Sequence, residues 1–294
     1  MERIQAALKK ARETRSGQQQ HENKPVPVSP VENRDTREDR ESEALVLSSD
    51  MALADREEAW KSIPAFTPSE KVLDRNRLIA HRASAASVPY DVMRTKLLHK
   101  MRKNKWTRVA ITSPSARAGK TMTCLNLAFS LSRQSDVFSM LLELDMRRPA
   151  MARSIGLKDD CQFSRALSGD ASPEKHMRRY GRNLILGANQ TPARNPAELL
   201  QGARAAHVID ELEAQYRPDI IILDTPPMFA GDDTMAFLDQ VDCALLIAEA
   251  EKTTIEEVDK CEQELASRTN VLGVILNKCR YLDRHEEYGK EYGY

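Results

Sequence analysis

The spacing of apolar and polar positions changes at about Val88, and this change divides the chain. From there on, short apolar runs alternate with segments whose apolar residues recur at helical spacing. The apolar runs predict strands at 108–112, 139–144, 184–187, 220–223, 244–248 and 271–276. The helical spacing predicts helices at 90–103, 120–133, 196–215, 234–238 and 254–267. This alternation is typical of a doubly wound, mostly parallel α/β sheet, and the nearly all-apolar strands favour helices on both faces.

The N-terminal part of the chain lacks this pattern. Residues 17–87 are rich in Gln, Glu, Arg, Pro and Ser, which predicts a mostly disordered linker. Before it, apolar residues from Ile4 to Ala11 recur at i, i+3, i+4 and i+7, which predicts a short amphipathic helix within residues 1–16. Such a helix either frays without consequence or docks on a partner or on the membrane surface.

Composition narrows the classes of function. The chain has 44 basic and 44 acidic residues, so no overall field favours nucleic acid as a partner. Its five cysteines form no C-x-x-C pair, which is typical of buried apolar residues in a reducing compartment. Residues 1–15 are charged throughout, unlike a signal peptide, and no apolar run approaches the roughly 20 residues of a membrane span. We therefore expect a cytoplasmic protein.

The triplet Gly119-Lys120-Thr121 stands between a predicted strand and a predicted helix, as a phosphate-binding loop does. Backbone N–H groups would cradle phosphates, Lys120 would reach the outer phosphates, and the Thr121 hydroxyl would hold Mg²⁺. Pro114 replaces the usual first glycine, so the triplet alone also fits an ordinary helix start. The residues expected to bind the nucleotide here are Ala116, Arg117, Ala118, Gly119, Lys120, Thr121 and Met122.

Two further segments carry carboxylates at strand ends. The strand at 220–223 leads into Asp224, which could bind Mg²⁺ or could serve as a turn residue or helix cap. Glu143 and Asp145 are two residues apart on a predicted strand, so we expect them to face the same side. One of them could hold the metal or accept a proton, and Arg147 could neutralise charge on a phosphoryl group. The expected catalytic residues are Lys120, Glu143, Asp145, Arg147 and Asp224, with Thr121, Asp145 and Asp224 at the metal.

Together these segments resemble the bacterial tyrosine kinases (BY-kinases) that control capsule and exopolysaccharide export. Pro114–Thr121 is similar to the Walker A loop of that family, Leu141–Arg147 to its second carboxylate motif, and Ile221–Pro227 to its Walker B strand. The resemblance implies a P-loop NTPase-type kinase domain over residues 88–280. It also implies ATP and Mg²⁺ as cofactors, with Asn277 near the adenine.

Residues 281–294 are rich in tyrosine and otherwise polar, which is typical of an accessible tail. The resemblance implies that this cluster is autophosphorylated in trans within a homo-oligomer. It also implies that a membrane polysaccharide co-polymerase supplies an activating cytoplasmic segment, which would bring the kinase to the inner face of the plasma membrane. The alternative is an ordinary tail with Tyr281 packed on the domain. The expected phosphoacceptors are Tyr281, Tyr288, Tyr292 and Tyr294.

Some positions depart from the family pattern. Glu143 stands where the family usually has Asp, so Glu143→Asp should keep or raise the rate. Of the glutamate and two arginines that the family uses for subunit contacts, Arg94 remains, with Val88 and Asp91 at the other positions. Two rival functions stay open, a catalytically weak nucleotide-binding regulator and a partitioning-type ATPase. The signature lysine of the latter group would fall at Ser115 and is missing.

Overall fold

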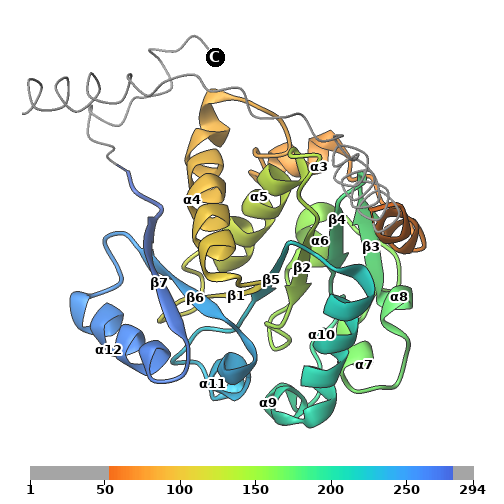
Figure 1. The fold of residues 1–294 in the computed structure, drawn as a ribbon. Helices are drawn as coiled ribbons and strands as arrows, with labels where there is room; N and C mark the ends of the chain where they lie inside the picture. The colour runs from red at the N-terminus through yellow and green to blue at the C-terminus, as the bar shows by residue number, and fades with distance from the viewer. Residues whose placement is uncertain (1–52, 281–294) are drawn as a thin grey trace, which may run out of the picture. The chain divides into compact units, whose positions relative to one another are not determined.

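A seven-stranded sheet organises residues 53–280, which are the residues that the computed structural model describes. The strand order is β3-β4-β2-β5-β1-β6-β7 (Figure 1). Neighbouring strands run parallel, except that β3 is antiparallel to β4 at one edge. The strands are β1 (Arg108–Thr112), β2 (Ser139–Glu143), β3 (Met177–Tyr180), β4 (Leu184–Gly187), β5 (Ile220–Asp224), β6 (Cys243–Glu249) and β7 (Asn270–Asn277).

Helices cover both faces of the sheet, as its nearly all-apolar strands require (Figure 1). The helices α4 and α5 bury the face that carries Ile111 and Ile222, whereas α10 covers Ile221 and Leu223 on the other face. The helices are α3 (Glu70–Arg75), α4 (Val88–Asn104), α5 (Lys120–Ser132), α6 (Met151–Ile155), α7 (Phe163–Leu167), α8 (Pro173–His176), α9 (Pro196–Gln201), α10 (Ala203–Tyr216), α11 (Asp233–Phe237) and α12 (Ile255–Ala266), with short 3₁₀ turns η1 (Ala85–Ser87) and η2 (Leu238–Gln240).

The predicted α/β fold class is confirmed, and all six predicted strands are present with ends shifted by at most one residue. The pattern missed β3, whose consecutive Arg178 and Arg179 interrupt any apolar run. It also missed four short helices, α3, α6, α7 and α8, which contain too few turns to show a helical period.

The single helix predicted at 196–215 is corrected to two helices. α9 ends and α10 begins at Gly202, whose backbone is extended (φ −66°, ψ 136°). Glycine has a low helix propensity, so a break there carries little penalty. The resulting change of direction lets α10 bury Val208, Ile209 and Leu212 against the sheet.

The linker predicted up to residue 87 is corrected for its described part, residues 53–87. This stretch is helical at 53–61 and again in α3, and it fills both cores. Trp60 is buried, donates its indole N–H to the Tyr216 carbonyl at 2.7 Å, and meets the ring of Phe138 edge-on. Leu73 and Leu78 pack into the core beneath α4 and α5. Isolated apolar anchors in a polar stretch leave no periodic signal, so composition alone misassigned them.

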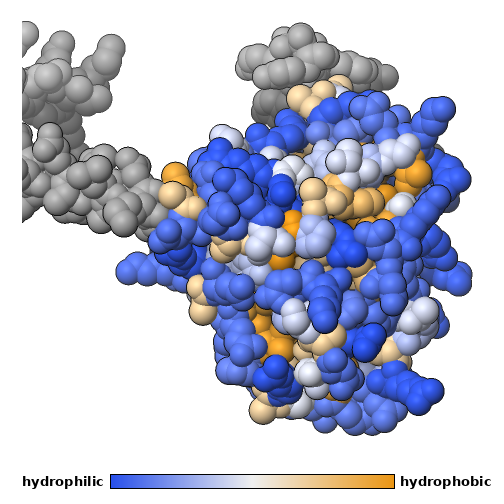
Figure 2. Space-filling model, turned by 90° about the vertical axis from the view of Figure 1, so that its right-hand side faces the viewer, coloured by the Kyte–Doolittle hydropathy of each residue, from blue (hydrophilic) through white to orange (hydrophobic). Residues whose placement is uncertain are grey.

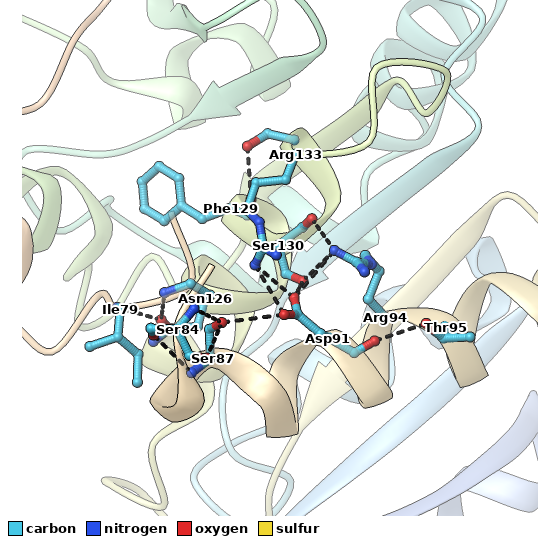
Figure 3. Close-up of polar contacts among 12 residues, drawn as sticks. Ile79, Ser84, Ser87, Asp91, Arg94, Thr95, Asn126, Phe129, Ser130 and Arg133 are labelled. Carbon is cyan, nitrogen blue, oxygen red and sulfur yellow. Dashed lines mark hydrogen bonds and ion pairs between the residues drawn. The ribbon is translucent and has the colours of Figure 1, made fainter. Parts of the chain in front are cut away.

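A polar cluster ties α4 to α5 and includes Asp91 and Arg94, two positions where the resemblance led us to expect subunit contacts (Figure 3). The Asp91 carboxylate accepts hydrogen bonds from Arg94 (3.2 Å), Arg133 (2.8 Å) and the Ser130 hydroxyl (2.5 Å). Arg94 also donates to the Ser130 carbonyl at 2.8 Å. Asp91 and Arg94 are therefore engaged within the chain, because their polar atoms already stabilise the packing of the two helices.

Three predicted segments lie outside the described residues: the helix within residues 1–16, the linker up to residue 52 and the tail 281–294. Across residues 53–280, none of the helices combines the length and apolar character needed to cross a bilayer.

Candidate active site

The loop between β1 and α5 has the form of a phosphate cradle. Gly119, which directly precedes α5, has a φ of +98°, a left-handed conformation that favours glycine. A Cβ at this position would lie 2.2 Å from the Asn277 side-chain nitrogen, so any other residue would force that side chain to move. The loop therefore delivers its backbone directly to the N-terminus of α5, where free N–H groups and the helix dipole favour an anion.

Lys120, the first residue of α5, is held inside this loop. Its side chain is 5% exposed, and its ammonium donates to the Ser113 hydroxyl at 3.2 Å. The Ser113 hydroxyl in turn donates to the carbonyl of Ser115 at 2.7 Å. A buried ammonium with one neutral partner keeps donors for phosphate oxygens.

A pocket of about 580 Å³ opens over the loop. This volume is within the usual range for small-molecule and cofactor sites. Among the predicted site residues, those that line it are Ala116, Arg117, Gly119, Lys120, Thr121, Met122, Asp145 and Arg147. The rest of its wall includes Arg148, Pro226, Pro227 and Lys278. The structure thus brings together the predicted loop, Asp145 and Arg147, which are separated in the sequence.

Asp224 lies at the end of β5, in register with Ile111 of the adjacent strand β1. Its side chain is 0% exposed, and within residues 53–280 neither carboxylate oxygen has a hydrogen-bond partner that meets the geometric criteria. Burial raises the pKa of Asp224 to about 6, and the Lys120 ammonium and the Thr121 hydroxyl counteract this rise. Leaving a buried carboxylate unpaired is costly, so the position favours a ligand.

These residues fit a hydrated magnesium ion bound together with phosphates. The part of the chain that the structure describes contains no group of three or more His, Cys, Asp or Glu side chains that could hold a metal alone. Mg²⁺ usually binds through one or two carboxylates, a hydroxyl, waters and substrate phosphates. Thr121, which lines the pocket, and Asp224, which is buried close to the Thr121 hydroxyl, would supply that hydroxyl and carboxylate.

Glu143 is placed differently from the expectation that it faces the pocket beside Asp145. The strand β2 ends at Glu143, and the N–H groups of Leu144 and Asp145 both donate to the Asp224 carbonyl at 2.9 Å. The strict alternation of strand side chains therefore stops at this point. Glu143 is 0% exposed and does not line the pocket.

The carboxylate of Glu143 instead holds the backbone of two loops. It accepts from the N–H groups of Ala150 and Met151 at 2.7 Å each and of Asn189 at 2.8 Å. Burial raises its pKa to about 7, with the three backbone donors opposing the rise and Asp224 adding to it. Glu143 thus holds the start of α6 and the loop at Asn189, and its part in catalysis, with the expected effect of Glu143→Asp, stays a prediction.

Asp145 and Arg147 remain at the pocket. Burial raises the pKa of Asp145, while the Lys120 ammonium lowers it. Arg147 donates to the Asp233 carboxylate at 2.6 Å, and that side chain is 1% exposed at the start of α11. Sequence reasoning missed Asp233. A Cβ at Gly231 would lie 3.0 Å from its carboxylate, so the intervening loop leaves little room around this pair.

The end of β7 closes the other side of the loop. Asn277 donates its side-chain amide to the Ala118 carbonyl at 2.8 Å, so it supports the loop directly. Its expected place near the adenine stays a prediction. Lys278, also missed from the sequence, donates to the Arg117 carbonyl (2.6 Å) and pairs with Glu249 (3.1 Å). Lys278 thus adds a cation to the pocket wall. In the sequence, its position next to Asn277 is the feature that could have pointed to it.

The parallel sheet, the loop before α5 and the buried carboxylate of β5 define a P-loop NTPase of the doubly wound α/β class. No family model matches the chain. A solved structure shows the shared fold: the septum site-determining protein MinD of Pyrococcus horikoshii, complexed with Mg-ADP. It aligns with a TM-score of 0.50 at 18% identity over 58% of this chain and 69% of that one.

Within this class, the chain is similar to a group of kinases. The tyrosine-protein kinase YwqD of Bacillus subtilis is 29% identical over 215 residues, which are 70% of this chain and 86% of that protein. The tyrosine-protein kinase etk of Escherichia coli is 28% identical over 66% of this chain and 27% of its own length. The kinase domain of etk aligns with a TM-score of 0.62 at 26% identity over 68% of this chain and 78% of that structure. By sequence and by fold the chain is similar to the bacterial tyrosine kinases (BY-kinases), which are associated with capsule and exopolysaccharide systems.

Proposed function

We propose that this protein is an ATP-dependent protein-tyrosine autokinase that regulates the polymerisation and export of an exopolysaccharide or capsule. The observation that carries the proposal is the buried, unpaired carboxylate of Asp224 beneath the Lys120 loop. A carboxylate in that position suits a Mg²⁺-bound nucleotide better than it suits a folded core. The kinase relatives support tyrosine as the acceptor.

In this proposal the predicted site residues divide the work of binding and catalysis. The loop backbone and Lys120 bind the phosphates of ATP, and Thr121 and Asp224 hold Mg²⁺ with Asp145 nearby. Bound Mg²⁺ would neutralise charge that develops on the transferred phosphoryl group. Asp145, whose pKa is raised by burial, accepts the proton of the attacking phenol. Arg147 binds equatorial phosphoryl oxygens and is oriented by Asp233.

The acceptors in this proposal are the tail tyrosines Tyr281, Tyr288, Tyr292 and Tyr294, modified in trans within a homo-oligomer. A tether of this kind raises the effective concentration of a phenol near a neighbouring site. The oligomer would need contacts other than the α4 positions Asp91 and Arg94, because both are engaged with α5. Each added phosphate would bring about −1.5 to −2 charges to the tail.

We further propose a membrane polysaccharide co-polymerase as the activating partner, with the kinase acting at the cytoplasmic face of the plasma membrane. The support is the length of one relative: the match to etk covers only 27% of that protein. In that relative the matched region is one part of a longer protein, which fits a kinase domain that acts together with further protein segments.

Phosphotyrosine blotting of the purified protein after incubation with ATP and Mg²⁺ tests the kinase function. We expect a signal that rises when the cytoplasmic segment of the partner is added. Lys120→Met should abolish it, because the phosphate-binding cation is lost. Changing all four tail tyrosines to Phe should remove most of the label while leaving ATP binding intact. If the native protein shows no phosphotyrosine even when the partner's segment is added, the proposal is wrong.

The burial of Glu143 favours a second candidate, a catalytically weak nucleotide-binding regulator. One carboxylate of the family's pair is used to hold backbone N–H groups, so Asp145 alone represents the pair at the pocket. The same blot separates the two functions. ATP binding by calorimetry without any phosphotyrosine would favour the regulator.

A further inference from the structure

A second and larger pocket lies away from the nucleotide site. It is a groove of about 750 Å³ between α4 and β7. Its floor is apolar and includes Tyr90, Met93 and Leu97 of α4 together with Leu272 and Ile275 of β7. Within residues 53–280 no segment fills this groove, although it continues the core that α4 and α5 share with the sheet.

The strand that borders the groove is an edge strand and is unusually apolar on its surface. β7 pairs with β6 on one side only, and its Leu276 and Val274 are 61% and 44% exposed. Val92 of α4 is 47% exposed on the other wall. The opposite edge of the sheet, near β3, lies on a mostly hydrophilic face with small separate apolar patches (Figure 2). An apolar edge of this kind marks a docking surface, because exposed edges are normally blunted by charge or covered.

The rim of the groove is basic. Lys96, His99 and Lys100 follow one side of α4 and are exposed. The described residues that line the groove include no Asp or Glu. An occupant that suits both floor and rim therefore combines aromatic or aliphatic side chains with carboxylates.

Residues 281–294 of this chain have that combination. They hold four tyrosines and four acidic residues against two basic ones, and they follow β7 after only three residues. Fully extended, they could span roughly 45 Å, whereas α4 is about 25 Å long. The segment can therefore turn back and run the length of the groove. We infer that the tail of residues 281–294 docks in cis in the groove between α4 and β7, with its tyrosines on the apolar floor and its carboxylates at the basic rim.

Charge separates the tail from the other segment of the chain that could cover an apolar surface. The amphipathic stretch within residues 1–16 carries Lys9, Lys10, Arg12 and Arg15, which would face the basic rim. The positive charges of this stretch and of the rim would repel each other, which disfavours docking. A tail anchored directly after β7 also has a high effective concentration at the groove.

The docked form suits an unphosphorylated tail, because burying a phosphate dianion on an apolar floor is unfavourable. This consequence rests on the proposed kinase function, whereas the docking itself does not. A docked tail would withhold its phenols from the pocket, and phosphorylation would release the tail.

Hydrogen exchange measured by mass spectrometry on the full chain, without nucleotide, tests the docking. We expect the amides of residues 281–294 to exchange more slowly than an unstructured peptide of the same sequence. Lys96→Glu combined with Lys100→Glu should accelerate this exchange roughly tenfold, the factor expected when a few surface ion pairs become repulsive. Adding Glu286→Lys and Glu287→Lys should restore the slow exchange by swapping the charges. Both lysines are exposed, so the fold should tolerate their replacement.

Lys103→Glu is the matched control, since Lys103 is an exposed lysine on α4 that does not line the groove. It should leave exchange of the tail unchanged. The inference would be overturned if the tail amides of the native protein were unprotected from exchange. It would also be overturned if they stayed protected in the Lys96→Glu, Lys100→Glu variant. Protection that disappears on dilution would assign the groove to the tail of a second copy, and protection of residues 1–16 instead would assign it to that segment; either result also overturns it. Exchange needs no catalysis, so these outcomes are independent of whether the protein is a kinase.

Discussion

Glu143 and Asp224 stand side by side at the C-terminal ends of two adjacent inner strands, and their hydrogen-bonding environments differ. They are paired in register across β2 and β5, and both are 0% exposed. Glu143 accepts three backbone N–H groups, whereas neither oxygen of Asp224 has a hydrogen-bond partner that meets the geometric criteria within residues 53–280. The protein thus satisfies one buried carboxylate with its own backbone, and the other is the one proposed above to take a ligand.

This difference shows that burial and position do not by themselves identify a functional carboxylate. Both groups have a raised pKa, chiefly because of burial. What separates them is the set of donors around each one. The longer side chain of Glu143 reaches the amides at the start of α6, while Asp224 stays beneath Lys120 and Thr121.

Asp224→Asn should give the largest effect, and it should be an effect on function. We expect a loss of roughly 10³-fold in Mg²⁺-dependent phosphoryl transfer, because one preorganised charge is removed from the site. The thermal midpoint of the nucleotide-free protein should stay the same or rise, since an unpaired buried carboxylate is relieved. The initial rate of phosphotyrosine formation with Mg-ATP checks the first part, and thermal unfolding checks the second. A marked fall in stability would show that Asp224 is structural like Glu143.

Glu143→Ala should act in the opposite sense, mainly on stability. It leaves the N–H groups of Ala150, Met151 and Asn189 without their acceptor. We expect the free energy of unfolding to fall by about 4 kcal/mol, allowing for some relief of the buried charge. Urea denaturation measures this loss. A variant that keeps its stability but loses phosphotransfer would break the comparison and return Glu143 to the catalytic group.

The pH dependence of stability should carry the signature of Asp224. Its pKa rises on folding from 3.8 to about 6, so between those values the folded state binds more protons than the unfolded state. Its contribution to stability is therefore complete below pH 3.8 and is lost as the pH rises to about 6. The expected loss is about 3 kcal/mol. In Asp224→Asn this part of the decline should be lost, while the decline caused by Glu143, whose pKa rises from 4.5 to about 7, remains. A stability difference between native protein and variant that does not change with pH across that window would contradict the assignment.

Glu143→Gln should have the smallest effect. The amide keeps an oxygen for the N–H groups of Ala150 and Met151 but turns a donor toward the N–H of Asn189. Removal of the charge next to Asp224 offsets part of that loss, so we expect a change of about 1 kcal/mol in the free energy of unfolding. Comparison with Glu143→Ala in the same urea series isolates the contribution of the accepting oxygen. Equal losses in the two variants would mean that the shape and the single accepting oxygen kept by Gln contribute little, and that the ionised carboxylate as a whole sets the role of this side chain.

Local sequence determined the order of the elements and the place of the nucleotide loop. The apolar runs located six strands within one residue because strands buried on both faces need uninterrupted apolar residues. Gly119, Lys120 and Thr121 were recognisable because a phosphate loop depends on backbone conformation and a helix start, both of which are local. Asp224 followed from the same logic as the residue after a buried strand.

Tertiary structure alone decided which polar groups meet. No local pattern could show that Glu143 reaches the amides of Ala150 and Asn189, that Arg147 pairs with Asp233, or that Trp60 fills the second core from a polar stretch. These contacts join segments that are distant in the chain, and periodicity reports only which face of an element is buried. The physical reason is that the role of a buried carboxylate depends on the hydrogen-bond donors that the fold brings to it. The sequence shows where a carboxylate occurs, but it does not show which donors will surround it.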